Sequence, residues 1–294
     1  MTMTFARTAK AAAVLALLAL APCKSYAWGI DYQDTYLSIR YLPEDKQPGH
    51  AKDVNEVAGN VSYANGWTYG SNFASIDFED FNYRGDPANS ASGHADSNSA
   101  EVYAVFRSVL SGNKVTGSNM FSYGPIRDVG LLIGFDFDTQ NDAFGSYKKL
   151  ITFGPQISFN LPRGFLNVTL GLSHEWNTNG FLSGGNGANF DPAFTIETAF
   201  AYPFAIGNIP LNFTGFANLI TPKGKGATGD FNHGLEILLH PKLMVDVGQL
   251  IGYTPKKLEA GVGFEYWHNK FGDVPRYVSG TEQKSVFVEV GYHY

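Results

Sequence analysis

Residues 286–294 read VFVEVGYHY, and their side chains alternate strictly between two kinds. In an extended strand, successive side chains point to opposite faces. One face of this segment would be entirely apolar or aromatic, with Val286, Val288, Val290, Tyr292 and Tyr294. The other face would be mixed, with Phe287, Glu289, Gly291 and His293. Such alternation over about ten residues is typical of a strand in a transmembrane β-barrel.

The same alternation recurs along most of the chain. Residues 258–267, LEAGVGFEYW, place one apolar residue between successive small or charged ones. Such runs predict about twelve antiparallel strands, an even number that puts both termini on the periplasmic side. The predicted strands lie near residues 33–42, 54–65, 71–83, 99–109, 125–138, 148–161, 164–176, 191–202, 209–219, 231–241, 257–269 and 283–294.

The lengths of the predicted links support this arrangement in part. Residues 84–98 and 177–190 are long and polar, as extracellular loops should be, whereas 161–164 forms a tight turn. Residues 110–124 and 242–256 are long where short periplasmic turns are expected. A count of fourteen strands, with short ones in these two links, therefore stays open.

The polar face of the predicted strands carries many charges. Burying that many ions in a dry core would cost several kcal/mol each, even after relaxation. A water-filled lumen removes this cost, and closure of the barrel pairs every backbone polar group that lipid cannot satisfy. A soluble β-sandwich with a solvated charged face is the alternative. The charged positions are Arg40, Asp77, Glu79, Arg107, Asp136, Glu197, Glu236, Glu259, Glu265 and Glu289.

Residues 1–27 have the pattern of a secretory signal peptide. Arg7 and Lys10 precede an apolar run at 11–21, and the segment ends in Ser25-Tyr26-Ala27, with small residues at the positions that a signal peptidase reads. The run is shorter than the roughly 20 residues that a membrane-spanning helix needs. We expect cleavage after Ala27, which leaves residues 28–294 as a single barrel domain. A lipoprotein anchor at Cys23 is the alternative, although the preceding proline fits that signal poorly.

Composition limits the partners. Residues 1–27 contain three of the 21 basic residues and none of the 27 acidic ones, so the remaining chain has a formal net charge of −9. Nucleic acid is excluded as a partner, because its phosphates require a basic surface. Cys23 is the only cysteine, so residues 28–294 can form neither a disulfide nor a thiolate metal site. We expect no cofactor and no metal.

Five short segments resemble, in the same order, those of the Tsx-type nucleoside-specific outer-membrane channels. The resemblance implies a monomeric twelve-stranded barrel with a narrow, keyhole-like pore, in which aromatic and ionisable side chains bind nucleosides. The family's nucleoside contacts cannot be matched here position by position, and the loops differ in length. The segments are IDFEDFNYRGD (76–86), YGP (123–125), GFDFDT (134–139), YWHN (266–269) and VGYHY (290–294).

A nucleoside is neutral, flat and hydroxylated, so a channel for it needs ring faces and hydrogen-bonding groups. Predicted inward positions supply the rings Tyr36, Phe73, Phe81, Tyr103, Phe216, Trp267 and Phe287. They also supply the ionisable groups Asp77, Glu79, Arg107, Glu197, Glu236 and Glu265. Each of these side chains has an alternative role in filling the lumen or bracing its wall. A general porin, with a cation bias from its acidic excess, is the alternative function.

An enzymatic role is not expected. Outer-membrane lipid hydrolases place a serine two residues after a histidine, but Trp176 stands at that position after His174. No activated nucleophile is evident. The expected partners are therefore the solute, membrane lipid, anionic lipopolysaccharide through residues 222–225 (PKGK), and the barrel-assembly machinery through the strand that ends at Tyr294.

Overall fold

A computed structural model describes residues 29–50, 52–82, 99–140, 146–178, 187–225 and 232–294, except the side chains of Phe81, Asn82 and Ser99. The predicted signal peptide therefore lies outside the described residues. No helix in these ranges has both the length and the hydropathy needed to span a bilayer.

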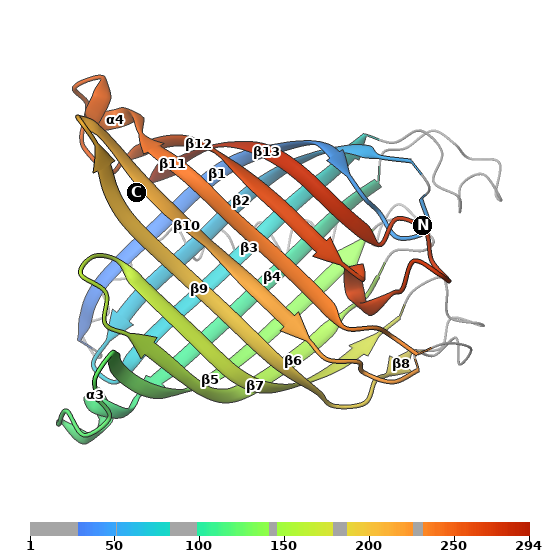
Figure 1. The fold of residues 1–294 in the computed structure, drawn as a ribbon, viewed down its shortest axis with the longest axis horizontal. Coiled ribbons are helices and arrows are strands. Elements are labelled where there is room, and N and C mark those ends of the chain that lie inside the picture. Colours follow the sequence, from blue (N-terminus) through green and yellow to red (C-terminus); the bar gives the residue numbers. More distant parts are fainter. Residues whose placement is uncertain (1–28, 51, 83–98, 141–145, 179–186, 226–231) are drawn as a thin grey trace, which may run out of the picture.

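Twelve long antiparallel strands form one closed barrel in the described part of the chain (Figure 1). Each strand pairs with its neighbours in sequence, and β1 pairs with β13 to complete the ring. The two-residue strand β8 (Ala188–Asn189) only extends the edge of β7. The twelve are β1 (Ile30–Asp45), β2 (Val54–Trp67), β3 (Gly70–Asn82), β4 (Ser99–Ser111), β5 (Ile126–Gln140), β6 (Lys149–Phe159), β7 (Phe165–Asn177), β9 (Ala193–Ile206), β10 (Ile209–Ile220), β11 (Glu236–Asp246), β12 (Leu258–His268) and β13 (Glu282–His293).

The two long links hold short helices and no further strands. α3 (Gly112–Thr116) follows β4, and α4 (Val247–Leu250) follows β11. Both lie at the end of the barrel where β1 begins and β13 ends, near the C mark in Figure 1, and this end is called here the termini end. Twelve strands are thus confirmed in the described ranges, and the alternative of fourteen is wrong.

β11 differs most from its predicted range of 231–241, because it begins at Glu236 and continues to Asp246. Proline usually ends or interrupts a strand, so Pro241 hid the continuation. In the structure Pro241 lies opposite Gly215 of β10, and the pairing continues to Val245 opposite Leu211.

Side chains on the two faces of the barrel differ as the alternation predicted. Val262 and Val288 point outward and are each 52% exposed, whereas Glu265 and Glu289 point inward and are 8% and 3% exposed. An exposed apolar outer face with a charged interior is the reverse of a soluble protein, so the soluble β-sandwich is excluded.

Candidate functional site

The strand register places all the described candidate side chains on the inner face of the barrel. Phe81 lies in β3 with a side chain outside the described residues. The inward residues are Tyr36 on β1, Phe73, Asp77 and Glu79 on β3, Tyr103 and Arg107 on β4, Glu197 on β9, Phe216 on β10, Glu236 on β11, Glu265 and Trp267 on β12, and Phe287 on β13.

Three rings form a stack on the inner wall. The ring centroids of Phe216 and His240 are 5.0 Å apart and nearly parallel, and those of His240 and Phe287 are 4.5 Å apart. Glu265 orients the imidazole through a 2.8 Å contact with Nδ1. Phe287 is only 1% exposed and packs against the buried side of His240. Phe216, on the other side of His240, is 38% exposed and presents an open ring face to the lumen.

Glycine on the neighbouring strand makes room for this stack. A Cβ atom at Gly263 would lie 2.0 Å from the Phe287 ring. A similar arrangement holds Tyr36, since a Cβ atom at Gly291 would lie 2.0 Å from its hydroxyl oxygen. The glycines of the polar face therefore let lumen rings lie flat on the wall.

Tyr36 is held against that wall by further contacts. Its hydroxyl donates a 2.7 Å hydrogen bond to Glu289, and its ring centroid is 4.6 Å from that of His293. The Lys242 ammonium group pairs with Glu289 and lies 5.1 Å from the centre of the Tyr36 ring. The pattern analysis missed His240 and Lys242. Their even spacing from Glu236 along β11 was the signal that could have found them.

Arg107 makes the strongest polar contact between distant strands. Its guanidinium donates to both carboxylate oxygens of Glu197 on β9, at 2.8 and 2.9 Å, and to Asp136 on β5 at 2.5 Å. It also donates to the backbone carbonyl oxygens of Phe106 and Phe135, at 3.0 and 3.3 Å. Five protein oxygen atoms thus hold this group, so it is a fixed part of the lumen.

Arg40 braces the wall between neighbouring strands. Its guanidinium lies 3.1 Å from Glu56 on β2 and 3.6 and 3.8 Å from Glu79 and Asp77 on β3. It also lies 5.8 Å from the centre of the Phe287 ring. Asp77 and Glu79 therefore have an ion-pairing role, whether or not a solute contacts them.

The link between β12 and β13 folds into the barrel at the end opposite the termini, called here the loop end. Lys270, in the short 3-10 helix η2 (Lys270–Gly272), is buried. Its ammonium group contacts Asp45 at 3.3 Å, Gln283 at 3.1 Å and the carbonyl oxygen of Lys46 at 2.8 Å. Burial opposes its charge, but Asp45 and Glu265 hold the pKa of Lys270 above its usual range.

The next residue, Phe271, narrows the same end. Its ring packs edge-on against Trp267, with centroids 4.9 Å apart, and the Lys148 ammonium group lies 5.7 Å from its centre. Lys148 also donates to the Tyr103 hydroxyl at 3.2 Å, and the Trp267 indole donates to Glu236 at 3.0 Å. These contacts tie the candidate residues Tyr103, Trp267 and Glu236 into one layer that reaches from β4 to β12.

Lys223 does not occupy the exposed position predicted for it. Its ammonium group pairs with Glu175 at 2.5 Å and lies 4.6 Å from the centre of the Phe190 ring. The side chain is almost wholly buried, because its ammonium group pairs with the inward carboxylate of Glu175. A contact between Lys223 and lipopolysaccharide is therefore wrong, while Lys225 in the same segment is exposed.

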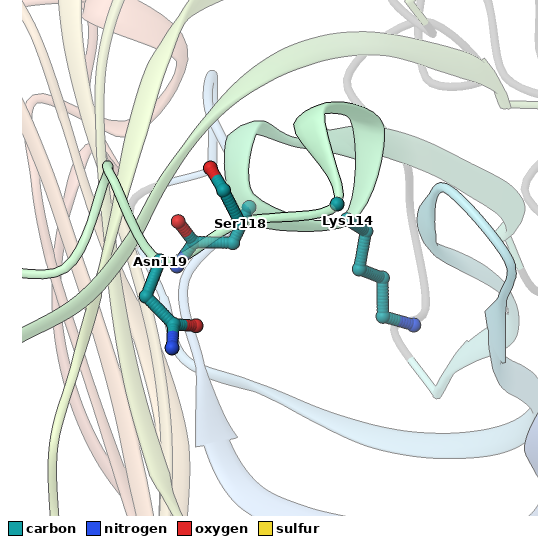
Figure 2. Close-up of a pocket in the computed structure, with 5 residues that line it drawn as sticks. Lys114, Ser118 and Asn119 are labelled. Atoms are coloured by element: carbon teal, nitrogen blue, oxygen red, sulfur yellow. The ribbon is translucent and has the colours of Figure 1, made fainter.

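Outside the lumen, a shallow hollow of about 290 Å³ lies beside α3, lined by Asn113, Lys114, Gly117, Ser118 and Asn119. Figure 2 shows Lys114 directed away from Ser118 and Asn119. Its ammonium group pairs with Asp31 and donates to the Trp67 carbonyl oxygen, so it ties the link to the barrel rim. None of the candidate residues lines this hollow, and we assign it no ligand. Among the described residues, no group of three or more His, Cys, Asp or Glu side chains is placed to hold a metal ion.

Neither a family model nor a curated protein matches the sequence. Solved structures are similar at low sequence identity. The translocator domain of the autotransporter NalP from Neisseria meningitidis is 11% identical, over 99% of this chain and 97% of that one, with a TM-score of 0.41. The β domain of the Bordetella autotransporter BrkA is 10% identical over 90% and 99% of the two chains, with a TM-score of 0.40. The NanC porin is 10% identical over 87% and 97%, with a TM-score of 0.39.

The closed ring of strands, the apolar outer face and the charged interior define the class of this protein. It is a membrane-spanning antiparallel β-barrel.

Proposed function

We propose that the chain is an outer-membrane channel for passive passage of small polar solutes, and that nucleosides are the solutes it favours. The observation that carries this proposal is the open ring face of Phe216, which is stacked on His240 and directed into a lumen rich in charged groups. A ring face of this kind can stack with a base, and polar neighbours can bind ribose hydroxyl groups.

The expected binding is weak, as conduction requires. Stacking of a base on an aromatic side chain contributes about 1–3 kcal/mol in nucleic-acid binders. Binding of that size favours entry of the solute without preventing its exit. Asn218 follows Phe216 on the same inward face of β10 and offers an amide for the ribose or the base edge.

Current through planar bilayers tests the proposal. Millimolar adenosine should reduce the current through the purified protein, whereas ribose, which lacks a base, should have little effect. Phe216→Ala should weaken the block by adenosine several-fold, because the open ring face is lost. Phe213→Ala is the matched control, since Phe213 lies on the same strand with its ring on the outer face.

An unchanged current at saturating adenosine and thymidine would reject the preference for nucleosides. The alternative is then a general porin, in which the acidic excess favours cations. A reversal potential measured across a salt gradient distinguishes a cation-biased porin from an unselective one. Equal effects of the two phenylalanine substitutions would show that stacking on Phe216 is not the cause of the block.

The remaining parts of the proposal concern location and partners. The exposed apolar outer face favours residence in the outer membrane, with delivery through a signal peptide at residues 1–27 and assembly through β13. The barrel closes on itself without a second copy, which supports a monomer. We assign no reaction to the chain. His174 lies on the outer face, where its ring contacts Asn189 at 2.7 Å and packs against Trp176. Trp176 occupies the position at which a hydrolase motif needs a serine.

A further inference from the structure

We propose that the ion pair between Arg107 and Glu197 is a strut across the lumen, and that it sets the largest solute that can pass. The inference rests on the proposed channel function and adds the element that determines size selectivity. In the ring of strands, β5, β6 and β7 lie between β4, which carries Arg107, and β9, which carries Glu197. The two side chains nevertheless meet with a two-point contact at 2.8 and 2.9 Å.

The strands beneath the strut are shaped to accommodate it. Thr152 on β6 and Thr169 on β7 face the lumen, and each is only 1% exposed. Small side chains of this kind leave room for a long side chain to pass above them, and Gln156, which donates to the Thr169 hydroxyl at 3.2 Å, contributes to their burial. Gly134, directly opposite Arg107 on β5, has no side chain in the way, and a Cβ atom there would lie 2.6 Å from Arg107 Cδ.

The contacts of the Arg107 guanidinium indicate that it is a fixed part of the barrel and not a side chain that binds a passing solute. A two-point contact between arginine and a carboxylate fixes both distance and orientation. Asp136 and two backbone carbonyl oxygens hold the same group from the near wall. A solute would have to displace these acceptors to bind Arg107.

Two exposed inward rings flank the ends of the strut. Phe73 on β3 pairs directly with Arg107, and Phe216 lies on β10 close to the Glu197–Asn218 pair. A flat solute that passes the strut therefore meets ring faces at the same height of the barrel. This arrangement would admit planar molecules and retard bulky ones.

Liposome swelling with sugars of increasing size tests the strut. Arg107→Ala and Glu197→Ala remove the two ends of the strut separately, so each should raise the swelling rate with a disaccharide several-fold relative to a pentose. Arg40→Ala is the matched control. It removes the same charge from the lumen, but the ion pairs of Arg40 are with the neighbouring strands β2 and β3 and its guanidinium lies against the Phe287 ring, so the size limit should stay unchanged. Slower migration of the boiled than of the unboiled protein in SDS gels establishes folding of each variant.

Three results are decisive. The inference is supported if every strut variant that folds admits larger sugars while Arg40→Ala keeps the size limit of the unmodified protein. Passage of the pentose with the same size limit in every folded variant overturns the strut and leaves the channel intact. If the unmodified, folded protein does not admit the pentose, the channel function is overturned. The role of the strut in selectivity is then overturned as well.

Discussion

Individual glycines determine how the rings lie in this lumen. The alternating pattern predicted that Gly263 and Gly291 face inward, but it gave no reason for glycine there. The structure supplies one, because a Cβ atom at either position would lie 2.0 Å from a lumen ring. Contacts of this kind cross between strands and depend on rotamers, so a strand pattern alone cannot predict them.

Replacement of Gly263 by alanine should destabilise the barrel by about 1–3 kcal/mol, the usual cost of overpacking. The added methyl group must displace the Phe287 ring and, with it, the stack that supports Phe216. Urea titration of the protein in lipid vesicles measures the loss. Gly59→Ala is the control, because a Cβ atom at Gly59 meets nothing within 4 Å. Equal stability of the two variants would contradict the tight fit at Gly263.

At the scale of elements, alternation along the strands was sufficient to predict which face each strand turns to the lumen. It failed in the links, where no periodic pattern exists. The link between β12 and β13 shows why: its backbone has left-handed φ angles of 50° at Asn269 and 61° at Phe271. A left-handed conformation costs about 1–2 kcal/mol for a residue with a Cβ atom. Only contacts made by the folded barrel keep the link in this shape, and the sequence does not display them.

Lys270 is the main polar anchor of this link. Replacing Lys270 by alanine leaves Asp45, which is fully buried, without its cation, and breaking a buried pair in this way typically costs about 3–5 kcal/mol. The link should then detach from the loop end and become open to trypsin at Arg276. Time courses of proteolysis on the folded barrel measure this change.

Lys284→Ala provides the control for that experiment, because Lys284 is an exposed residue on β13 that points to the outer face. Its loss should leave cleavage at Arg276 unchanged. If Lys270→Ala is as resistant to trypsin as the unmodified protein, the ion pair with Asp45 does not hold the link.

For the whole molecule, the sequence predicted the closed barrel and the orientation of its candidate residues, but not how those residues combine. Arg107 and Glu197 are 90 residues apart in the chain, and three strands lie between theirs in the ring. Their contact depends on the cross-section of the closed barrel, which local alternation does not specify. Likewise, Phe216 and Phe287 were both predicted inward, yet only the full packing shows which of them is open to a solute.

A lipid-facing surface makes a prediction for the molecule as a whole. Val288→Lys should destabilise the barrel in vesicles by about 2–4 kcal/mol if the position lies near the bilayer midplane, since lipid solvates an ammonium group poorly. Val115→Lys should have almost no effect. Val115 has a nearly equal exposure of 54%, but it lies in α3 at the termini end. Equal losses in urea titrations would mean that the outer face of the strands does not meet lipid.

The pairing of β1 with β13 has a consequence for biogenesis. His293 and Asp34, 259 residues apart, meet across this seam at 2.8 Å, and the seam joins the first strand of the ring to the last. A nascent chain that stops short of β13 would therefore keep two unpaired sheet edges, which are prone to aggregate. The barrel is therefore free of open sheet edges only when its first and last strands are both present.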